Sequence, residues 1–405
     1  MQLTMKSTPL SIANVLILLA ALTALGPLAI DAYLPAIPTM AISFNTSIHD
    51  IEFSLSLFLA GFSLGQLIGG PISDHMGRRL TIFTGLLIFV LGTLGIIFSA
   101  SLASLLLFRV IEAIGGGIAI VNSSAIIRDI SSGKDSARNL SHMAMIMMLA
   151  PLFAPMMGST ILHLSDWHSI FIFLLIYTVT ISLFIFRHIP ETRIKHTHEI
   201  STVQRYLIVL KHRRALGFIF AMCCSSAGMF AFITSSPSVY MGYFEVSEVF
   251  FPFLFGANII SLIAANRLNV LLLKHYEAHQ LLSLGQLIQL ISGIVLLSYI
   301  LLFSMHELAV VVVLVMLFVG SQGLIVSNAI SSTIEFFPHN SGTASALLGA
   351  SGFGAGALTG TLVGILGDGT PLPMASVMAG CILTGISLRF IFQPANRNLG
   401  LTLDK

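Results

Sequence analysis

The sequence predicts an all-α membrane protein with twelve transmembrane helices, and three observations lead to this fold class. Of its 405 residues, 56% are hydrophobic and only 9% are charged, whereas soluble proteins carry about a quarter charged residues. Apolar stretches of the roughly 20 residues that span a bilayer as a helix recur along the whole chain. The few charges gather in the short segments between these stretches.

The apolar stretches can be counted in order, with the first near the N-terminus. It follows Lys6 and runs straight into the letters DAYLPAIP without a clear cleavage site, so we expect a retained helix rather than a signal peptide. The predicted spans are 12–36, 50–72, 79–99, 102–125, 140–163, 168–187, 214–237, 249–271, 280–303, 308–332, 342–366 and 374–393.

The longest polar segment divides these spans into six plus six. It runs from Arg187 to Arg214 and is basic and rich in histidine. We therefore predict an N-terminal six-helix bundle at residues 1–190, a cytoplasmic linker loop at 191–213 and a C-terminal six-helix bundle at 214–405.

The basic residues predict the orientation. If the N-terminus is cytoplasmic, every Lys and Arg of the 19 except Arg109 falls in a cytoplasmic loop or at a cytoplasmic helix end. Lys and Arg are enriched on the cytoplasmic side of membrane proteins. Both termini and the linker are therefore predicted to be cytoplasmic, as is the charged turn between the second and third spans.

Small residues recur every four positions in the second, fifth, eighth and eleventh spans, a pattern that lets helices approach closely. Under a six-helix repeat the second and eighth spans are equivalent, and so are the fifth and eleventh. The pattern predicts two halves that meet along these four helices, which is the geometry that alternating access needs. The residues are Gly61, Gly65, Gly69; Ala150, Ala154, Gly158; Ala257, Ser261, Ala265; and Gly352, Gly356, Gly360, Gly364.

Three ionisable residues fall inside predicted spans, where such groups are costly and usually functional. Asp31 lies in the outer half of the first span, and Arg109 and Glu112 lie in the fourth, three residues apart and so on one helix face. A carboxyl group placed there can titrate near neutral pH, as proton coupling requires. Two alternatives stay open: a static Arg109–Glu112 pair that only locks helices, and an Asp31 that faces water because Tyr33 and Pro35 suggest a nearby helix end.

Several function classes lack their sequence features. There is no Walker motif and no H-E-x-x-H zinc motif, so we predict no ATPase, no metal site and no cofactor. The net charge of +2 is small and not clustered, which argues against nucleic-acid binding. The three cysteines form no C-x-x-C pair. The buried groups include no nucleophile–base set, so an enzyme is not expected, and energy must come from an ion gradient or from the solute's own gradient.

The charged turn GGPISDHMGRR resembles the cytoplasmic loop 2–3 signature of the major facilitator superfamily, written G-x-x-x-D-R-x-G-R-R/K. The matching residues are Gly70, Asp74, Gly77, Arg78 and Arg79. His75 replaces the usual Arg. The resemblance implies a contact that holds the cytoplasmic gate closed. We expect Asp74 to cap the first turn of the eleventh span at 341–343; the alternative is an Arg pair that only sets topology.

Two further segments resemble motifs of the same superfamily. RVIEAIGGG is similar to its span-4 motif, R-x-x-Q-G or R-x-x-Q-A, which implies that Arg109 occupies the proton-coupling position and that Glu112 stands where Gln is usual. APLFAPMMG resembles the span-5 antiporter motif with Ala in place of some Gly, and this favours exchange over symport. Its candidate residues are Ala150, Pro151, Ala154, Pro155 and Gly158.

Within the superfamily, an ordered set of segments resembles the bicyclomycin/chloramphenicol-resistance (Bcr/CflA-type) drug:proton antiporters. Asp31 matches the acidic residue that this family keeps in span 1. The resemblance implies a cavity lined by spans 1, 4, 7 and 10, and a large apolar cavity with few polar groups suits amphipathic compounds. The candidate lining residues, whose aromatics could equally serve packing, are Tyr33, Asn122, Phe230, Phe232, Gln322 and Asn328.

Together these patterns predict a proton-coupled multidrug exporter in the inner membrane of a bacterium. It would export small amphipathic drugs by alternating access, as a monomer in the lipid bilayer, driven by the proton gradient. The alternative is an exporter or facilitator of one physiological metabolite with the same architecture. A sensor or scaffold would need a signalling domain. The longest soluble stretch is only the linker, so this class of protein is not expected.

Overall fold

The computed structural model describes residues 12–131, 133–193, 202–337 and 341–393. Within these ranges, twelve helices are long and apolar enough to cross a membrane, which confirms the predicted number. The two termini, predicted to be cytoplasmic, lie outside the described residues.

The elements of the first half follow the predicted spans closely. They are α1 (Ile12–Asp31), the short η1 (Leu34–Ala36), α2 (Ile37–Ser43), α3 (Ile48–Met76), α4 (Arg78–Ile97), α5 (Leu102–Ile130), α6 (Gly133–Leu164) and α7 (Trp167–His188). The helix containing Asp31 ends at that residue, and the chain continues through η1 and α2, so the first span extends to Ser43.

The second half contributes the other six spans. Its elements are α8 (Thr202–Lys211), α9 (Arg213–Ser236), the π-helical turn η2 (Pro237–Tyr243), α10 (Phe251–Leu272), α11 (Ala278–Leu302), α12 (Leu308–Gly320), α13 (Gln322–Glu335), α14 (Ser341–Leu366) and α15 (Leu372–Phe392). The helix α8 lies inside the segment predicted to be a linker loop.

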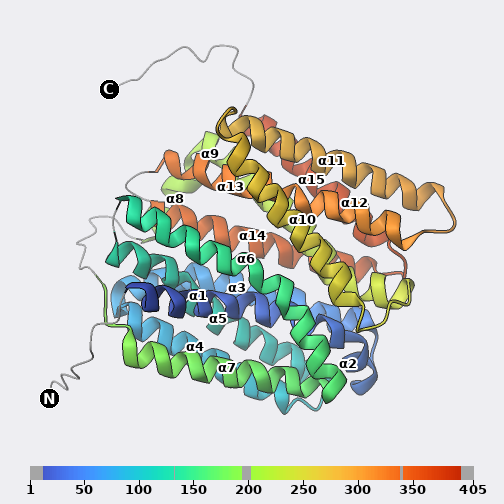
Figure 1. Cartoon of the computed structure of the whole chain (residues 1–405), viewed down its shortest axis with the longest axis horizontal. Helices are drawn as coiled ribbons and strands as arrows, with labels where there is room; N and C mark the ends of the chain where they lie inside the picture. Colours follow the sequence, from blue (N-terminus) through green and yellow to red (C-terminus); the bar gives the residue numbers. More distant parts are fainter. Residues whose placement is uncertain (1–11, 132, 194–201, 338–340, 394–405) are drawn as a thin grey trace.

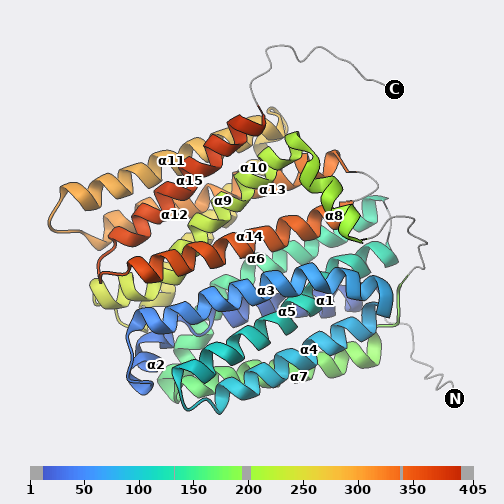
Figure 2. The same ribbon diagram turned by 180° about the vertical axis from the view of Figure 1, so that it is seen from behind.

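Helices α1 to α7 pack among themselves, and so do α9 to α15 (Figure 1). The two groups meet mainly where α3 and α14 run side by side (Figure 2). A second contact joins α6 to α10. In numbered spans these are the pairs 2/11 and 5/8, which are the helices predicted to lie where the halves meet.

The faces that meet differ from the prediction, because the small-residue ladders mostly serve packing within each half. A Cβ on Gly65 of α3 would collide with the carbonyl of Ile114 on α5. Ser261 of α10 donates to the Met316 carbonyl of α12 at 2.7 Å. A ladder of small residues permits close backbone approach but does not specify the partner. The contact from α3 to α14 instead includes the Ser63 hydroxyl, which donates to the carbonyl of Ala350 at 2.7 Å.

Local sequence signals explain where several helices begin. The Ser47 hydroxyl caps α3 by accepting from the backbone N–H of Asp50, whose carboxylate accepts from the Ser47 backbone N–H in return. Asp166 caps α7 by accepting from the backbone N–H of Ser169. Between α3 and α4 the chain turns at Gly77 alone, with φ of +98°. Few residues other than glycine adopt this conformation, which explains the glycine at that position of the charged turn.

Candidate functional site

Arg109 and Glu112 form a buried ion pair on α5, as their spacing predicts. Both side chains are 0% exposed, and the guanidinium Nη1 lies 2.7 Å from Glu112 Oε2. The Thr93 hydroxyl on α4 donates to the other carboxylate oxygen at 2.9 Å. The second guanidinium nitrogen of Arg109 donates to the carbonyl of Ala29 on α1 at 3.1 Å. The pair thus connects three helices.

Aromatic rings enclose the guanidinium of Arg109. Its central carbon lies 4.3 Å from the ring centre of Phe58 on α3, 4.5 Å from that of Tyr33 and 5.9 Å from that of Phe171 on α7. Ring faces attract cations, most strongly where water is excluded. The Tyr33 hydroxyl is itself held by Ser54 at 3.1 Å. Tyr33, predicted to line the cavity, therefore also contacts the charged pair.

Asp31 lies at the end of α1 and is only 3% exposed. This burial argues against the alternative in which Asp31 faces water. Its Oδ1 has no hydrogen-bond partner in the described part of the chain, and the carbonyl that holds Arg109 belongs to Ala29, two residues earlier. A buried carboxylate oxygen without a partner is costly when ionised. The surroundings of Asp31 therefore suit a group that exchanges a proton.

The span-5 residues belong to α6, which packs against α1. Gly158 lies against the carbonyl of Ala32, so close that a Cβ there would collide with it. Ala32 is the residue after Asp31, so this glycine sets the approach of α6 to the buried carboxylate. Ala154 and Pro155 are buried beside it, whereas Ala150 and Pro151 are partly exposed.

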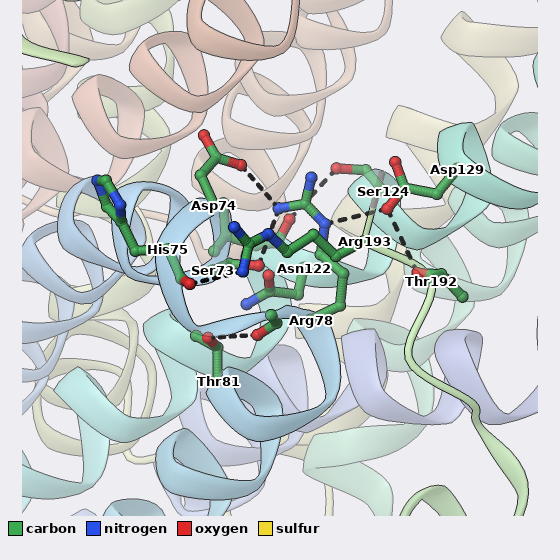
Figure 3. Close-up of polar contacts among 12 residues, drawn as sticks. Ser73, Asp74, His75, Arg78, Thr81, Asn122, Ser124, Asp129, Thr192 and Arg193 are labelled. Atoms are coloured by element: carbon green, nitrogen blue, oxygen red, sulfur yellow. Dashed lines mark hydrogen bonds and ion pairs between the residues drawn. The ribbon is translucent and has the colours of Figure 1, made fainter. Parts of the chain in front are cut away.

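The charged turn at the end of α3 forms a network of ion pairs (Figure 3). Arg78 lies 3.0 Å from Asp74 and 3.0 Å from Asp129 of α5, and it also donates to Ser73 at 2.8 Å. The second oxygen of Asp74 lies 3.2 Å from Arg205 of α8. Arg78 therefore fastens the end of α3 to the end of α5, and Asp74 fastens α3 to the helix inside the predicted linker.

Residues just after α7 complete this network. Glu191 accepts hydrogen bonds from the backbone N–H groups of Arg78 at 2.9 Å and Arg79 at 3.2 Å. Arg193 donates to the carbonyl of His75 at 2.7 Å (Figure 3). The Arg79 guanidinium stacks on Phe186 of α7, 4.5 Å from the ring centre.

Two other predictions for the charged turn have different outcomes. A Cβ on Gly70 would meet open space, so nothing in the described residues requires glycine there. The capping of the eleventh span by Asp74 stays a prediction, because residues 338–340 and the side chain of Ser341 lie outside the described set.

The remaining cavity candidates separate into two groups. Asn328 of α13 donates to Asn269 of α10 at 2.7 Å. Phe232 of α9 stacks on Phe255 of α10, with ring centres 6.0 Å apart. Both side chains therefore join helices. Phe230 lies against Gly356 and Phe353 of α14. The other two candidates each have a buried amide atom without a partner among the described residues, namely Asn122 Oδ1 and Gln322 Nε2. Both residues therefore have hydrogen-bonding capacity that the described residues do not use.

Sequence reasoning missed Phe58 and Thr93, which come from helices other than α5. Only the packing of three helices brings them to the pair. Counting along each helix gives no signal either, since Thr93 lies about one turn before the end of α4 and Glu112 nearly three turns after the start of α5. Among the described residues, no group of three or more His, Cys, Asp or Glu side chains could hold a metal ion.

The chain matches the family described as Major Facilitator Superfamily over residues 19–395. It belongs to this superfamily. It is therefore a multi-pass membrane transporter and not an enzyme, and transporters of this superfamily use ion gradients rather than a cofactor.

Relatives and solved structures agree with this assignment. A bicyclomycin resistance protein homolog of Haemophilus influenzae is 31% identical over 386 residues, covering 94% of this chain and 96% of the relative. A chloramphenicol resistance protein of Pseudomonas aeruginosa is 28% identical, covering 83% and 80%. The fold is similar to the partially occluded inward-open Escherichia coli xylose transporter XylE, with a TM-score of 0.71, 15% identity and coverage of 96% and 100%. It is also similar to the peptide transporter POT, with a TM-score of 0.74, 14% identity and coverage of 93% of each chain.

Proposed function

We propose that this transporter exports small amphipathic drugs across the inner membrane of a bacterium in exchange for protons. The observation that carries the proposal is the buried Arg109–Glu112 pair, 2.7 Å apart, near the buried Asp31. Ionisable groups this deep in a membrane protein typically serve ion or substrate pathways. The names of the relatives, which refer to bicyclomycin, chloramphenicol and multidrug resistance, support the class of substrate.

The proposed exchange uses the carboxylates as proton carriers. A proton that enters from outside neutralises Asp31 or Glu112 as the drug leaves outward. If Glu112 is neutralised, Arg109 loses its counter-charge but keeps its bond to the Ala29 carbonyl on α1. Protonation on α5 is therefore transmitted to the helix that ends at Asp31, and Arg109 couples the occupancy of one carboxylate to the position of the other.

The proposed moving parts are the bundles at residues 1–190 and 214–405, joined by the linker at 191–213. Both termini and the linker would be cytoplasmic, and the working unit a monomer. The ion-pair network of Asp74, Arg78 and Asp129 would hold the cytoplasmic ends together and rearrange when the transporter switches.

Transport into proteoliposomes tests this function. Purified protein would be reconstituted and a pH gradient imposed, and uptake of bicyclomycin, chloramphenicol and an amphipathic dye would be followed. We expect uptake only when the gradient drives protons in the opposite direction, and loss of uptake in the Arg109→Ala variant. Uptake that does not depend on the pH gradient would contradict proton exchange. Asp166→Asn is the matched control, since Asp166 is 61% exposed and its helix-capping role suits Asn equally.

A second candidate function is export of one polar metabolite. It is favoured by the buried amides of Asn122 and Gln322, each with an atom that has no partner in the described ranges. A site built to hydrogen-bond one solute rejects analogues that lack its polar group. If the metabolite is the substrate, the drug panel fails and a panel of polar metabolites gives gradient-driven uptake that is lost in Gln322→Leu.

A further inference from the structure

A third buried carboxylate, besides Asp31 and Glu112, lies at the end of the molecule predicted to be outer. Glu52, in the first turns of α3, is 1% exposed. Its Oε1 accepts a hydrogen bond from the backbone N–H of Ser238 at 2.9 Å, and its Oε2 lies 3.0 Å from Nδ1 of His49. The proposed proton exchange through Asp31 and Glu112 uses none of these groups.

The bond from Ser238 crosses between the two halves. Ser238 belongs to the turn η2 at the end of α9, where Pro237 interrupts the helix and lacks an N–H group. Glu52 belongs to α3, so one buried charge holds the outer ends of the second and seventh spans together. A hydrogen bond to an ionised carboxylate is shorter and stronger than one between neutral groups.

His49 adds a titratable group to the same contact. Its ring lies against Gly367, just after α14, where a Cβ would be only 3.0 Å from the ring atoms. The next residue, Asp368, acts electrostatically on His49, and so does Asp50 on α3. The side chain of His49 is 28% exposed, so protons can reach it from outside.

The other elements around this contact carry few charges. Glu52 also acts electrostatically on Tyr33, after α1. The turn η2 contributes only the phenols of Tyr240 and Tyr243, and neither α2 nor α14 contains an ionisable side chain other than hydroxyls. A protonated His49 is therefore surrounded by carboxylates from both halves and by no other cation in these elements.

We propose that His49 and Glu52 form a second proton-binding site, which fastens the outer ends of the two halves together when His49 is protonated. Histidine changes charge near neutral pH, within the range of the outer medium. Protonated His49 attracts Glu52 on its own helix and Asp368 of the other half. As the pH rises and His49 becomes neutral, the attraction to Asp368 is lost and the outer contact weakens.

This site would assist the return half of the cycle, and in this respect the inference rests on the proposed exchange by alternating access. After the drug has left outward, a proton arriving from the same side loads His49 and favours closure of the outer end. The drug-free transporter, with the exchanged proton bound, then returns to its inward-facing state. The site is separate from the carboxylates proposed to carry the transported proton.

Distance measurements between spin labels test the proposal. Labels at Ala100 and Met305, both exposed at outer loops of opposite halves, would report the outer separation by double electron–electron resonance in nanodiscs, in a full-length background without the native cysteines. When the pH is lowered from about 8 to about 5.5, the wild-type population with the short, closed distance is expected to rise about threefold. His49→Gln should stay at the high-pH distribution, and Asp368→Asn should weaken the shift.

The matched control is His168→Gln, because His168 also pairs with a carboxylate on the outer side but within one half, at 3.1 Å from Asp166. It should keep the wild-type shift. Glu52→Gln should open the outer end at both pH values; if it does not fold, His49→Gln still decides. No shift in wild type, or an unchanged shift in His49→Gln, would overturn the proposal. Because no drug is present, a failure of drug exchange leaves this result unaffected, and the two proposals can fail separately.

Discussion

The Arg109–Glu112 pair and the Asp74–Arg78–Asp129 network use the same chemistry in different surroundings. In the first, each side chain is fully buried and Arg109 has a single counter-charge among the described residues. In the second, the side chains are 12% to 29% exposed, and both Asp74 and Arg78 have two charged partners. Removing one partner from a buried pair leaves an uncompensated charge, whereas a partly exposed network with duplicate partners redistributes its contacts.

Loss of the buried carboxylate should have the largest effect. Glu112→Ala leaves Arg109 without a counter-charge inside the protein, and breaking a buried pair in this way costs about 3–5 kcal/mol. Thermal unfolding in detergent should show a clearly lowered Tm, and proton-driven uptake should be abolished. Glu112→Gln, which keeps a hydrogen-bond acceptor but not the charge, should recover part of the stability and none of the uptake. Normal uptake by Glu112→Gln would remove Glu112 from the coupling mechanism.

Replacing the guanidinium while keeping its charge tests the aromatic enclosure. Arg109→Lys retains the cation but loses the planar group that stacks on Phe58 and bonds both Glu112 and Ala29. We expect uptake to fall at least about tenfold, equivalent to about 1.4 kcal/mol. Wild-type uptake by Arg109→Lys would show that charge alone suffices.

Removing one ring should have an intermediate effect. Phe58→Leu keeps an apolar side chain but removes the closest ring face, and cation–π contacts range from about 0.5 kcal/mol at exposed sites to about 2 kcal/mol where water is excluded. Stability should fall by an amount in that range, with a matching decrease in uptake. Phe171→Leu is the comparison, because its ring centre lies 5.9 Å from the Arg109 guanidinium carbon, whereas that of Phe58 lies 4.3 Å away. A larger loss of stability in Phe171→Leu than in Phe58→Leu would contradict the assignment of Phe58 as the main aromatic partner.

The Asp74–Arg78–Asp129 network should respond least to a single change. Arg205→Ala removes one partner of Asp74, which keeps Arg78 at 3.0 Å. Partly exposed ion pairs contribute about 0–1 kcal/mol, so uptake should fall by no more than about twofold. Asp74→Asn affects both partners and should cost more. If Arg205→Ala lowers uptake as much as Glu112→Ala does, the proposed difference between the buried pair and the partly exposed network is wrong.

The sequence predicted the features that depend on a single helix. Apolar runs located the twelve spans, and the three-residue spacing placed Arg109 beside Glu112. It did not predict the contacts that depend on how helices pack against one another. Thr93 and Phe58 come from α4 and α3, and nothing in their local sequence marks them. The ladder of α3 could not reveal that its glycines face α5 rather than α14, and Arg205 lies in a segment predicted to be a loop.

The most direct test of the central claim is proton release on drug binding. Purified transporter in weakly buffered detergent would be mixed with each drug, and the pH followed for wild type, Asp31→Asn, Glu112→Gln and the control Asp166→Asn. The account predicts release from wild type and from the control, and its loss in one of the two buried variants, which would identify the carrier. Drug binding without proton release from wild type would contradict the exchange mechanism.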